Sequence, residues 1–311
     1  MAAFPALFSP GRIGPLEAKN RLVMAPMVRN YADPEGKSTA RYLAHIRRIA
    51  RGGVGTMVLE ASYVTPDGKG FVNQLGIHTD DTIPGLREMA RAAHDQGVLI
   101  GPQLYHAGSQ TGSAISGVQP VAPSPIACPT VGEVPRALTV EEIGGIVDAF
   151  GQGARRAKEA GCDFVEVHGA HGYLVMQFLS PLTNQRDDEY GGTPDKRMRF
   201  LEEVIGAVRG AAGADFPITV RLSGDELVTG GLRLDDTVAV ARRLEALGVN
   251  ALHLSAGSYA SYAQGLMIQP MAIPDGPLVP YAQTVKDAVG VPVIAVGKLR
   301  APEMDDELVR T

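Results

Sequence analysis

Two histidines and a tyrosine stand close together near the middle of the chain. The segment VEVHGAHGYLVMQFL places His168, His171 and Tyr173 just after a short apolar run. Imidazole N–H groups donate hydrogen bonds to carbonyl oxygens, and a phenol hydroxyl can deliver a proton. Donors that converge on one oxygen polarise a conjugated carbonyl and stabilise the enolate that develops from it. This segment therefore predicts acid–base chemistry on a carbonyl compound.

Simpler interpretations of the same three residues stay open at this point. Histidines three positions apart can ligate a metal, but no carboxylate or thiol has an evident matching position, so zinc is disfavoured. The histidines can instead be structural parts of a tight loop. Tyr173 can be a core residue.

Polar side chains also stand near the ends of other apolar runs. Gln103 and Arg221 occupy such positions, where a polar group is costly unless it meets a polar ligand. The alternative for Arg221 is a buried ion pair with Glu166 or Asp225. Ala61 follows a further run, and its small side chain would let a flat ligand lie close.

Gly297 and Lys298 follow the last apolar run. Backbone N–H groups together with an ammonium suit a phosphate. A lone Gly-Lys pair is weak evidence, because a solvated loop lysine is the more common explanation.

The elements that position these residues alternate along the chain. Apolar runs typical of strands that are covered on both faces occupy residues 22–25, 54–59, 98–104, 164–167, 218–222, 251–254 and 292–296. Amphipathic stretches between them predict helices over 39–51, 80–96, 139–160, 193–210, 234–248 and 280–290, and three of these carry start signals: Ser38, Thr139 with Glu142, and Thr193 before Pro194.

This alternation predicts a parallel sheet with right-handed crossovers. A (β/α)₈ barrel fits better than an open doubly wound sheet, because no glycine-rich phosphate turn follows the first strand, which leads instead into Ala25, Pro26 and Met27. Seven strands are counted, so we expect one barrel domain over residues 1–311 that lacks its eighth βα unit. Two long segments, 105–138 and 171–193, leave the carboxyl ends of strands, where barrel enzymes build their sites.

Composition narrows the class of protein. The chain has 311 residues, 45% of them apolar, with 29 basic and 34 acidic side chains and a net charge of −5. This balance predicts a soluble globular protein without overall attraction for nucleic acid or anionic membranes. The sequence shows no apolar run of membrane-spanning length and no signal peptide, and its two cysteines cannot form a disulfide framework, so we expect a cytoplasmic location.

The chain resembles the old yellow enzyme family of FMN-dependent NAD(P)H:flavin oxidoreductases. The matching segments are LFSPGRIGPLEAKNRLVMAPM, GPQLYHAG, HGAHGYLVMQFLSPLTNQRDDEYGGTPDKRMRF and VPVIAVGKL, which together extend over almost the whole chain. The resemblance supports the barrel and implies FMN at its carboxyl-end mouth, with NADPH or NADH as reductant and a small enone or enoate as substrate. A homo-oligomer is possible.

The resemblance also implies roles for individual residues. His168 and His171 would bind the substrate carbonyl, and Tyr173 would protonate the carbon next to it. The cofactor would be held by Ala25, Pro26, Met27, Ala61, Gln103, Arg221, Gly297 and Lys298: the first four against the ring, Gln103 at its pyrimidine edge, Arg221 near N1 and O2, and the last two at the phosphate.

The chain departs from some relatives at two positions. Val28 and Asn30 stand where those relatives have cysteine and tyrosine, which makes this segment more similar to the dienoyl-CoA and enoate reductase subgroup. Three alternatives follow from the count of strands and this similarity. The chain is an active ene-reductase, a degenerate barrel without FMN or redox activity, or the front part of a multidomain reductase.

Overall fold

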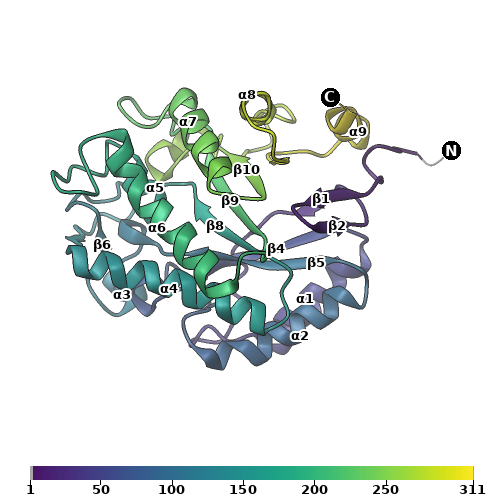
Figure 1. Cartoon of the computed structure of the whole chain (residues 1–311), viewed down its shortest axis with the longest axis horizontal. Coiled ribbons are helices and arrows are strands. Elements are labelled where there is room, and N and C mark those ends of the chain that lie inside the picture. Colours follow the sequence, from purple (N-terminus) through teal and green to yellow (C-terminus); the bar gives the residue numbers. More distant parts are fainter. Residues whose placement is uncertain (1–2, 311) are drawn as a thin grey trace.

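The computed structural model describes residues 3–310, in which seven parallel strands curl into a nearly closed barrel (Figure 1). In spatial order they are β11 (Val293–Ala295), β10 (Ala251–Ser255), β9 (Ile218–Ser223), β8 (Val165–Gly169), β5 (Leu99–Tyr105), β4 (Thr56–Tyr63) and β3 (Val23–Met24). All seven expected strands are confirmed. Their order is the sequential one that right-handed βα crossovers produce, so the barrel prediction is confirmed as well.

Helices cover the outside of the curved sheet (Figure 1). The long ones are α1 (Ala40–Arg51), α2 (Ile83–His94), α4 (Val140–Glu159), α6 (Pro194–Ala212), α7 (Leu234–Ala246), α8 (Val279–Ala288) and α9 (Pro302–Arg310). Two of the three predicted start signals are confirmed: Thr139 forms a capping box with Glu142, and the Thr193 hydroxyl accepts from the backbone of Lys196. The third is wrong by one residue, because Thr39 rather than Ser38 accepts the N–H of Tyr42 and caps α1.

The long segments contain structure that the sequence did not predict. Segment 105–138 includes α3 (Ser113–Ser116) and the short strands β6 (Val121–Ala122) and β7 (Arg136–Ala137), while segment 171–193 begins with α5 (Leu174–Leu179). An additional hairpin, β1 (Gly11–Ile13) and β2 (Leu16–Ala18), precedes the barrel. Its turn contains Gly14 at φ +55°, in the left-handed region where glycine is favoured.

Burial differs between the interior and the edges of the sheet. Every residue of β4, β8, β9 and β10 is buried, whereas β3 and β11 are half-buried and each has a strand on one side only. The backbone N–H of Leu7 donates to Asp306 Oδ1 (2.8 Å), which attaches the N-terminal segment to α9 on the same side of the molecule (Figure 1). The expectation of a missing eighth unit stays a prediction. Within residues 3–310 no helix is long and apolar enough to cross a membrane.

Candidate active site at the barrel mouth

Neighbouring strands bring polar residues together inside the barrel. In the sheet register, Arg221 of β9 lies between His168 of β8 and His253 of β10, and Gln103 of β5 lies beside Glu166 of β8. All five side chains are buried. Strand pairing thus gathers groups that are up to 150 positions apart in sequence, because side chains of adjacent parallel strands that share a register face the same side.

Glu166 is the acceptor at the centre of this group. Its Oε1 accepts from Gln103 Nε2 (2.7 Å), and its Oε2 contacts His253 Nδ1 (3.0 Å). Burial raises the pKa of Glu166, but His253, Arg221 and Gln103 favour the carboxylate and bring the pKa below its ordinary value. Because the Gln103 amide donates to Glu166, its carbonyl oxygen is left to accept from a ligand.

Arg221 is almost fully buried, at 7% exposed, and its Nε has no hydrogen-bond partner within residues 3–310. Within residues 3–310, Arg221 forms no ion pair with Glu166 or Asp225, so this predicted alternative is wrong. Asp225 pairs with Arg233 instead (3.2 Å), and Glu166 acts on the guanidinium through electrostatic attraction rather than at ion-pair distance. A buried, unpartnered guanidinium N–H is costly without a ligand. Arg221 therefore fits an electron-rich, hydrogen-bond-accepting group at the barrel mouth.

His168, His171 and Tyr173 form a compact aromatic cluster. The ring centroid of His168 lies 5.2 Å from that of His171 and 4.9 Å from that of Tyr173. The Ala170 N–H donates to Nδ1 of His168 (3.3 Å), which places the imidazole proton on Nε2. His171 Nε2 contacts the Ser255 hydroxyl at 2.7 Å.

Burial sets the protonation states of this cluster. It lowers the pKa of both histidines, and the nearby charge of Arg221 lowers them further. Burial also raises the pKa of Tyr173, with the Tyr105 and Tyr259 hydroxyls adding to the effect. At neutral pH the cluster therefore consists of two neutral imidazoles and a protonated phenol and has no net charge. The imidazoles can donate hydrogen bonds, and the phenol can donate a proton.

The loop after β8 is held in an uncommon conformation. His171 has φ +61° and is followed by Gly172 at φ +80°. The His171 N–H donates to Ser223 Oγ (3.0 Å), and its backbone forms a bridge with Ser258. A non-glycine residue in the left-handed region costs free energy that the surroundings must offset, and such residues concentrate at functional sites.

The predicted cofactor residues of β3 and β4 lie at the ends and interiors of these strands. Ala25, Pro26 and Met27 follow β3 directly; Pro26 is buried and Met27 is exposed. Ala61 is buried inside β4, next to a bulge at Glu60. We expected the strand to end near Ala61, but it continues to residue 63. The small side chains of Ala25 and Ala61 are compatible with the predicted contact with a flat ring. Their contacts with FMN stay predictions.

Gly297 and Lys298 follow β11, as expected. The Lys298 ammonium, however, donates to the carbonyls of Pro270 (3.0 Å), Met271 (2.8 Å) and Ile273 of the β10–α8 segment. Its contact with a phosphate stays a prediction, and would require the ammonium to leave or share these carbonyls.

Three residues of the site were missed by sequence reasoning. His253 had a usable signal, since a histidine within the buried run ALHLS needs a polar partner. Ser255 and Tyr259 had none, because a serine at a strand end and a tyrosine in a loop are ordinary features.

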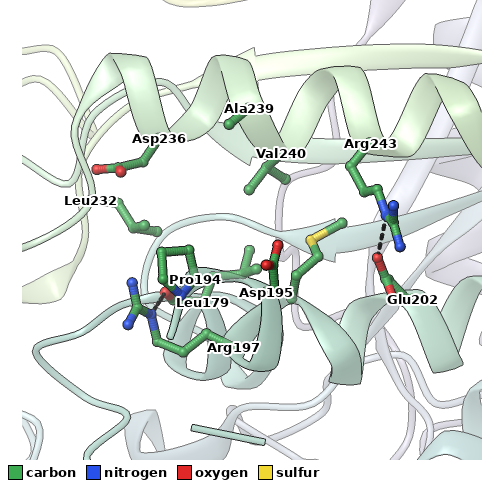
Figure 2. A pocket seen from close by; sticks show the side chains of 11 residues that line it. Leu179, Pro194, Asp195, Arg197, Glu202, Leu232, Asp236, Ala239, Val240 and Arg243 are labelled. Atoms are coloured by element: carbon green, nitrogen blue, oxygen red, sulfur yellow. Dashed lines mark hydrogen bonds and ion pairs between the residues drawn. The ribbon is translucent and has the colours of Figure 1, made fainter. Parts of the chain in front are cut away.

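A groove between α6 and α7 lies on the outer surface of the barrel (Figure 2). Its two arginines are already engaged: Arg243 pairs with Glu202, and Arg197 Nε donates to the Leu179 carbonyl (2.9 Å). None of the predicted site residues lines it. The barrel mouth is therefore the better candidate for chemistry.

The chain is similar to known proteins over almost its whole length. The chain is 44% identical to an NADH oxidase of Thermoanaerobacter brockii over 99% of this chain and 48% of that protein, and 39% identical to an NADPH dehydrogenase of Geobacillus sp. (strain WCH70) over 98% and 86%. Among solved structures, the old yellow enzyme homologue from Zymomonas mobilis matches with a TM-score of 0.82 at 30% identity, over 98% of this chain and 86% of that one.

The chain thus spans about half the length of the Thermoanaerobacter relative and most of the length of the other two. The family model of NADH:flavin oxidoreductases and NADH oxidases, an FMN family, matches residues 6–311. The resemblance to old yellow enzymes is confirmed, and the chain belongs to the NADH:flavin oxidoreductase / NADH oxidase family.

Proposed function

We propose that this chain reduces the C=C bond of α,β-unsaturated carbonyl compounds with NAD(P)H. When bound, FMN supplies the hydride equivalent that it receives from NAD(P)H. The observation that carries the proposal is the cluster of His168, His171 and Tyr173, in which two neutral imidazoles stand beside a protonated phenol. This set of donors suits a substrate that needs its carbonyl polarised and its α carbon protonated.

The two histidines hold the substrate oxygen in this proposal. The Nε2–H of His168 is free to donate because Nδ1 already accepts from the backbone. His171 is oriented by the Ser255 hydroxyl and can donate through its other ring nitrogen. Two donors on one oxygen withdraw charge from the conjugated system and make its β carbon electrophilic.

Tyr173 supplies the proton in this proposal. Its raised pKa keeps the hydroxyl protonated until an enolate, a stronger base than water, approaches it. The transfer breaks the tyrosine O–H bond and forms the C–H bond at the α carbon.

Gln103 and Arg221 would hold the FMN ring. The Gln103 carbonyl would accept from an N–H at the ring edge, and the Arg221 Nε–H, which has no partner within residues 3–310, would donate to an acceptor of the ring. The remaining contacts are those predicted for Ala25, Pro26, Met27 and Ala61 at the ring and for Gly297 and Lys298 at the phosphate.

A second candidate function is that this chain is the front part of a multidomain reductase. The NADH oxidase of Thermoanaerobacter brockii is about twice as long as the stretch of it that matches this chain. In this interpretation the barrel works beside further domains. The nucleotide sequence beyond the codon for Thr311 tests it directly.

Rapid anaerobic mixing tests the main proposal. FMN-loaded protein is first mixed with NADPH or NADH and then with cyclohexenone, and the visible flavin band is followed. The proposal predicts bleaching in the first step and recovery in the second. Bleaching without recovery would exclude enone reduction, and protein that retains no FMN would support the degenerate-barrel alternative.

A further inference from the structure

Tyr259 places a second phenol beside the proposed proton donor. It begins the short 3₁₀ helix η4 (Tyr259–Gln264) after β10, and its hydroxyl lies 3.0 Å from the hydroxyl of Tyr173. The two rings meet edge to face, with centroids 5.7 Å apart. Tyr173 is buried at 8% exposure, whereas Tyr259 is only half-buried. The pair therefore connects the interior of the site with its edge.

The segment that carries Tyr259 is fixed relative to the loop that carries Tyr173. The backbone bridge between His171 and Ser258 joins them. Ser261 Oγ accepts from the Ser258 N–H (2.8 Å) and donates to the Ser258 carbonyl (3.1 Å), which closes the first turn of η4. These backbone contacts hold the two segments together and thereby keep the two hydroxyls close to each other.

Tyr173 needs such a partner once it has donated its proton. Burial makes a phenolate at this position unfavourable. The other phenol beside it, Tyr105, is fully buried and has no exposed side through which to gain a proton. His168 is buried and neutral, and His171, although half-buried, has no ring contact with Tyr173 within residues 3–310. The described residues whose rings contact the Tyr173 ring are Tyr105, His168 and Tyr259, and of these three only Tyr259 is half-buried rather than buried.

We propose that Tyr259 returns the proton to Tyr173 and thereby completes a two-phenol relay from solvent to substrate. The proposal rests on the proposed function. As the Tyr173 O–H bond breaks and the α C–H bond forms, the Tyr259 O–H bond breaks and the Tyr173 O–H bond forms again. Tyr259 then takes a proton from water. The hydride, which carries both electrons, would come from NAD(P)H through FMN, so one hydride and one solvent proton are consumed for each C=C bond reduced.

Tyr259→Phe tests the relay, since it removes the hydroxyl and keeps the ring. We expect substrate reduction by the NAD(P)H-reduced protein to slow by about tenfold or more, with flavin reduction unchanged. Rates measured across mixtures of H₂O and D₂O should curve in the wild type, where two protons move together, and become linear in the variant. Tyr281→Phe is the matched control. Within residues 3–310 this tyrosine of α8 has no hydrogen bond or ring contact with either phenol, so the substitution should alter neither rate nor curvature.

Each outcome decides between two claims. An unchanged rate for Tyr259→Phe, or a slower rate with unchanged curvature, would overturn the relay while the proposed function stands. If Tyr173→Phe also leaves substrate reduction unchanged, the donor assigned in the proposed function is itself wrong.

A second readout needs no turnover. With 3-fluorotyrosine at position 259, its pKa is measured by ¹⁹F NMR in the wild-type and Tyr173→Phe backgrounds. The hydrogen bond with Tyr173 lowers the pKa of Tyr259 against the effect of burial, so Tyr173→Phe should raise it. Equal pKa values in the two backgrounds would contradict a direct bond between the hydroxyls.

Discussion

Replacing Arg221 by methionine should lower the reduction potential of the bound flavin. Methionine has a similar length and no charge, so it removes the guanidinium with little change in volume. Arg221 is buried and its Nε lacks a partner within residues 3–310, so a ligand at the mouth meets a cation that no carboxylate holds at ion-pair distance. If that cation stabilises the anionic reduced ring, its loss destabilises the reduced form more than the oxidised one.

The size of the shift follows from one charge-assisted hydrogen bond. Such a bond contributes about 1.5–3 kcal/mol, against about 0.5–1.5 kcal/mol for a neutral one. For a two-electron couple, about 1.4 kcal/mol corresponds to 30 mV. Loss of the bond to the reduced form alone would shift the potential by roughly 30–65 mV, and the part shared with the oxidised form reduces this value. We therefore expect the potential to decrease by tens of millivolts, and by no more than about 65 mV.

Spectroelectrochemical titration of FMN-loaded protein measures the potential directly. Arg221→Lys is the control, because it retains the charge but loses the planar fork, and it should shift the potential less than methionine does. An unchanged potential in Arg221→Met, with FMN still bound, would place Arg221 away from the ring and refute the assignment.

Three further predictions follow from the site and the fold. Tyr173→Phe should slow substrate reduction by about 10²–10⁴-fold and leave flavin reduction unchanged, as stopped-flow absorbance would show; equal slowing of both steps would contradict its role as proton donor. Folding lowers the pKa of His168 and His171, so at a pH below the ordinary histidine pKa the unfolded chain binds more protons than the folded chain. The free energy of unfolding should therefore fall as the pH drops from 7 towards 5. His168→Gln should weaken this dependence in thermal unfolding scans, and an unaltered slope would show that His168 does not cause it. Thr139→Ala removes the cap of α4 and should cost about 1 kcal/mol of stability by denaturant titration, whereas no change would mean that Glu142 alone is sufficient.

The barrel was predictable because its signals are local. Each strand is a short apolar run. The glycines and capping residues that begin or end a helix lie within a few residues of its first or last turn. The capping box of Thr139 and Glu142 is complete within four positions. The error at Ser38 has a local cause as well. Adjacent serine and threonine both suit the cap, and the additional bond from the Thr39 hydroxyl to the Tyr31 carbonyl favours Thr39.

The polar contacts of the site depend on the whole fold. Gln103 meets Glu166 across 63 positions, and Tyr173 meets Tyr259 across 86. Residue types predicted a chemical role for His168 and Tyr173. They could not predict which neighbouring group determines the tautomer of His168 or which hydroxyl contacts that of Tyr173. The Lys298 ammonium was equally unpredictable, because the carbonyls it contacts belong to a segment more than 20 positions away.

Isotope tracing of the product tests the central claim most directly. A substituted cyclohexenone is reduced once in D₂O with unlabelled NAD(P)H and once in H₂O with nicotinamide cofactor deuterated at its hydride position, and NMR locates the label. The account predicts solvent deuterium at the α carbon and cofactor deuterium at the β carbon. Solvent deuterium missing from the α carbon, or cofactor deuterium found there, would contradict protonation by Tyr173 at the mouth of this barrel.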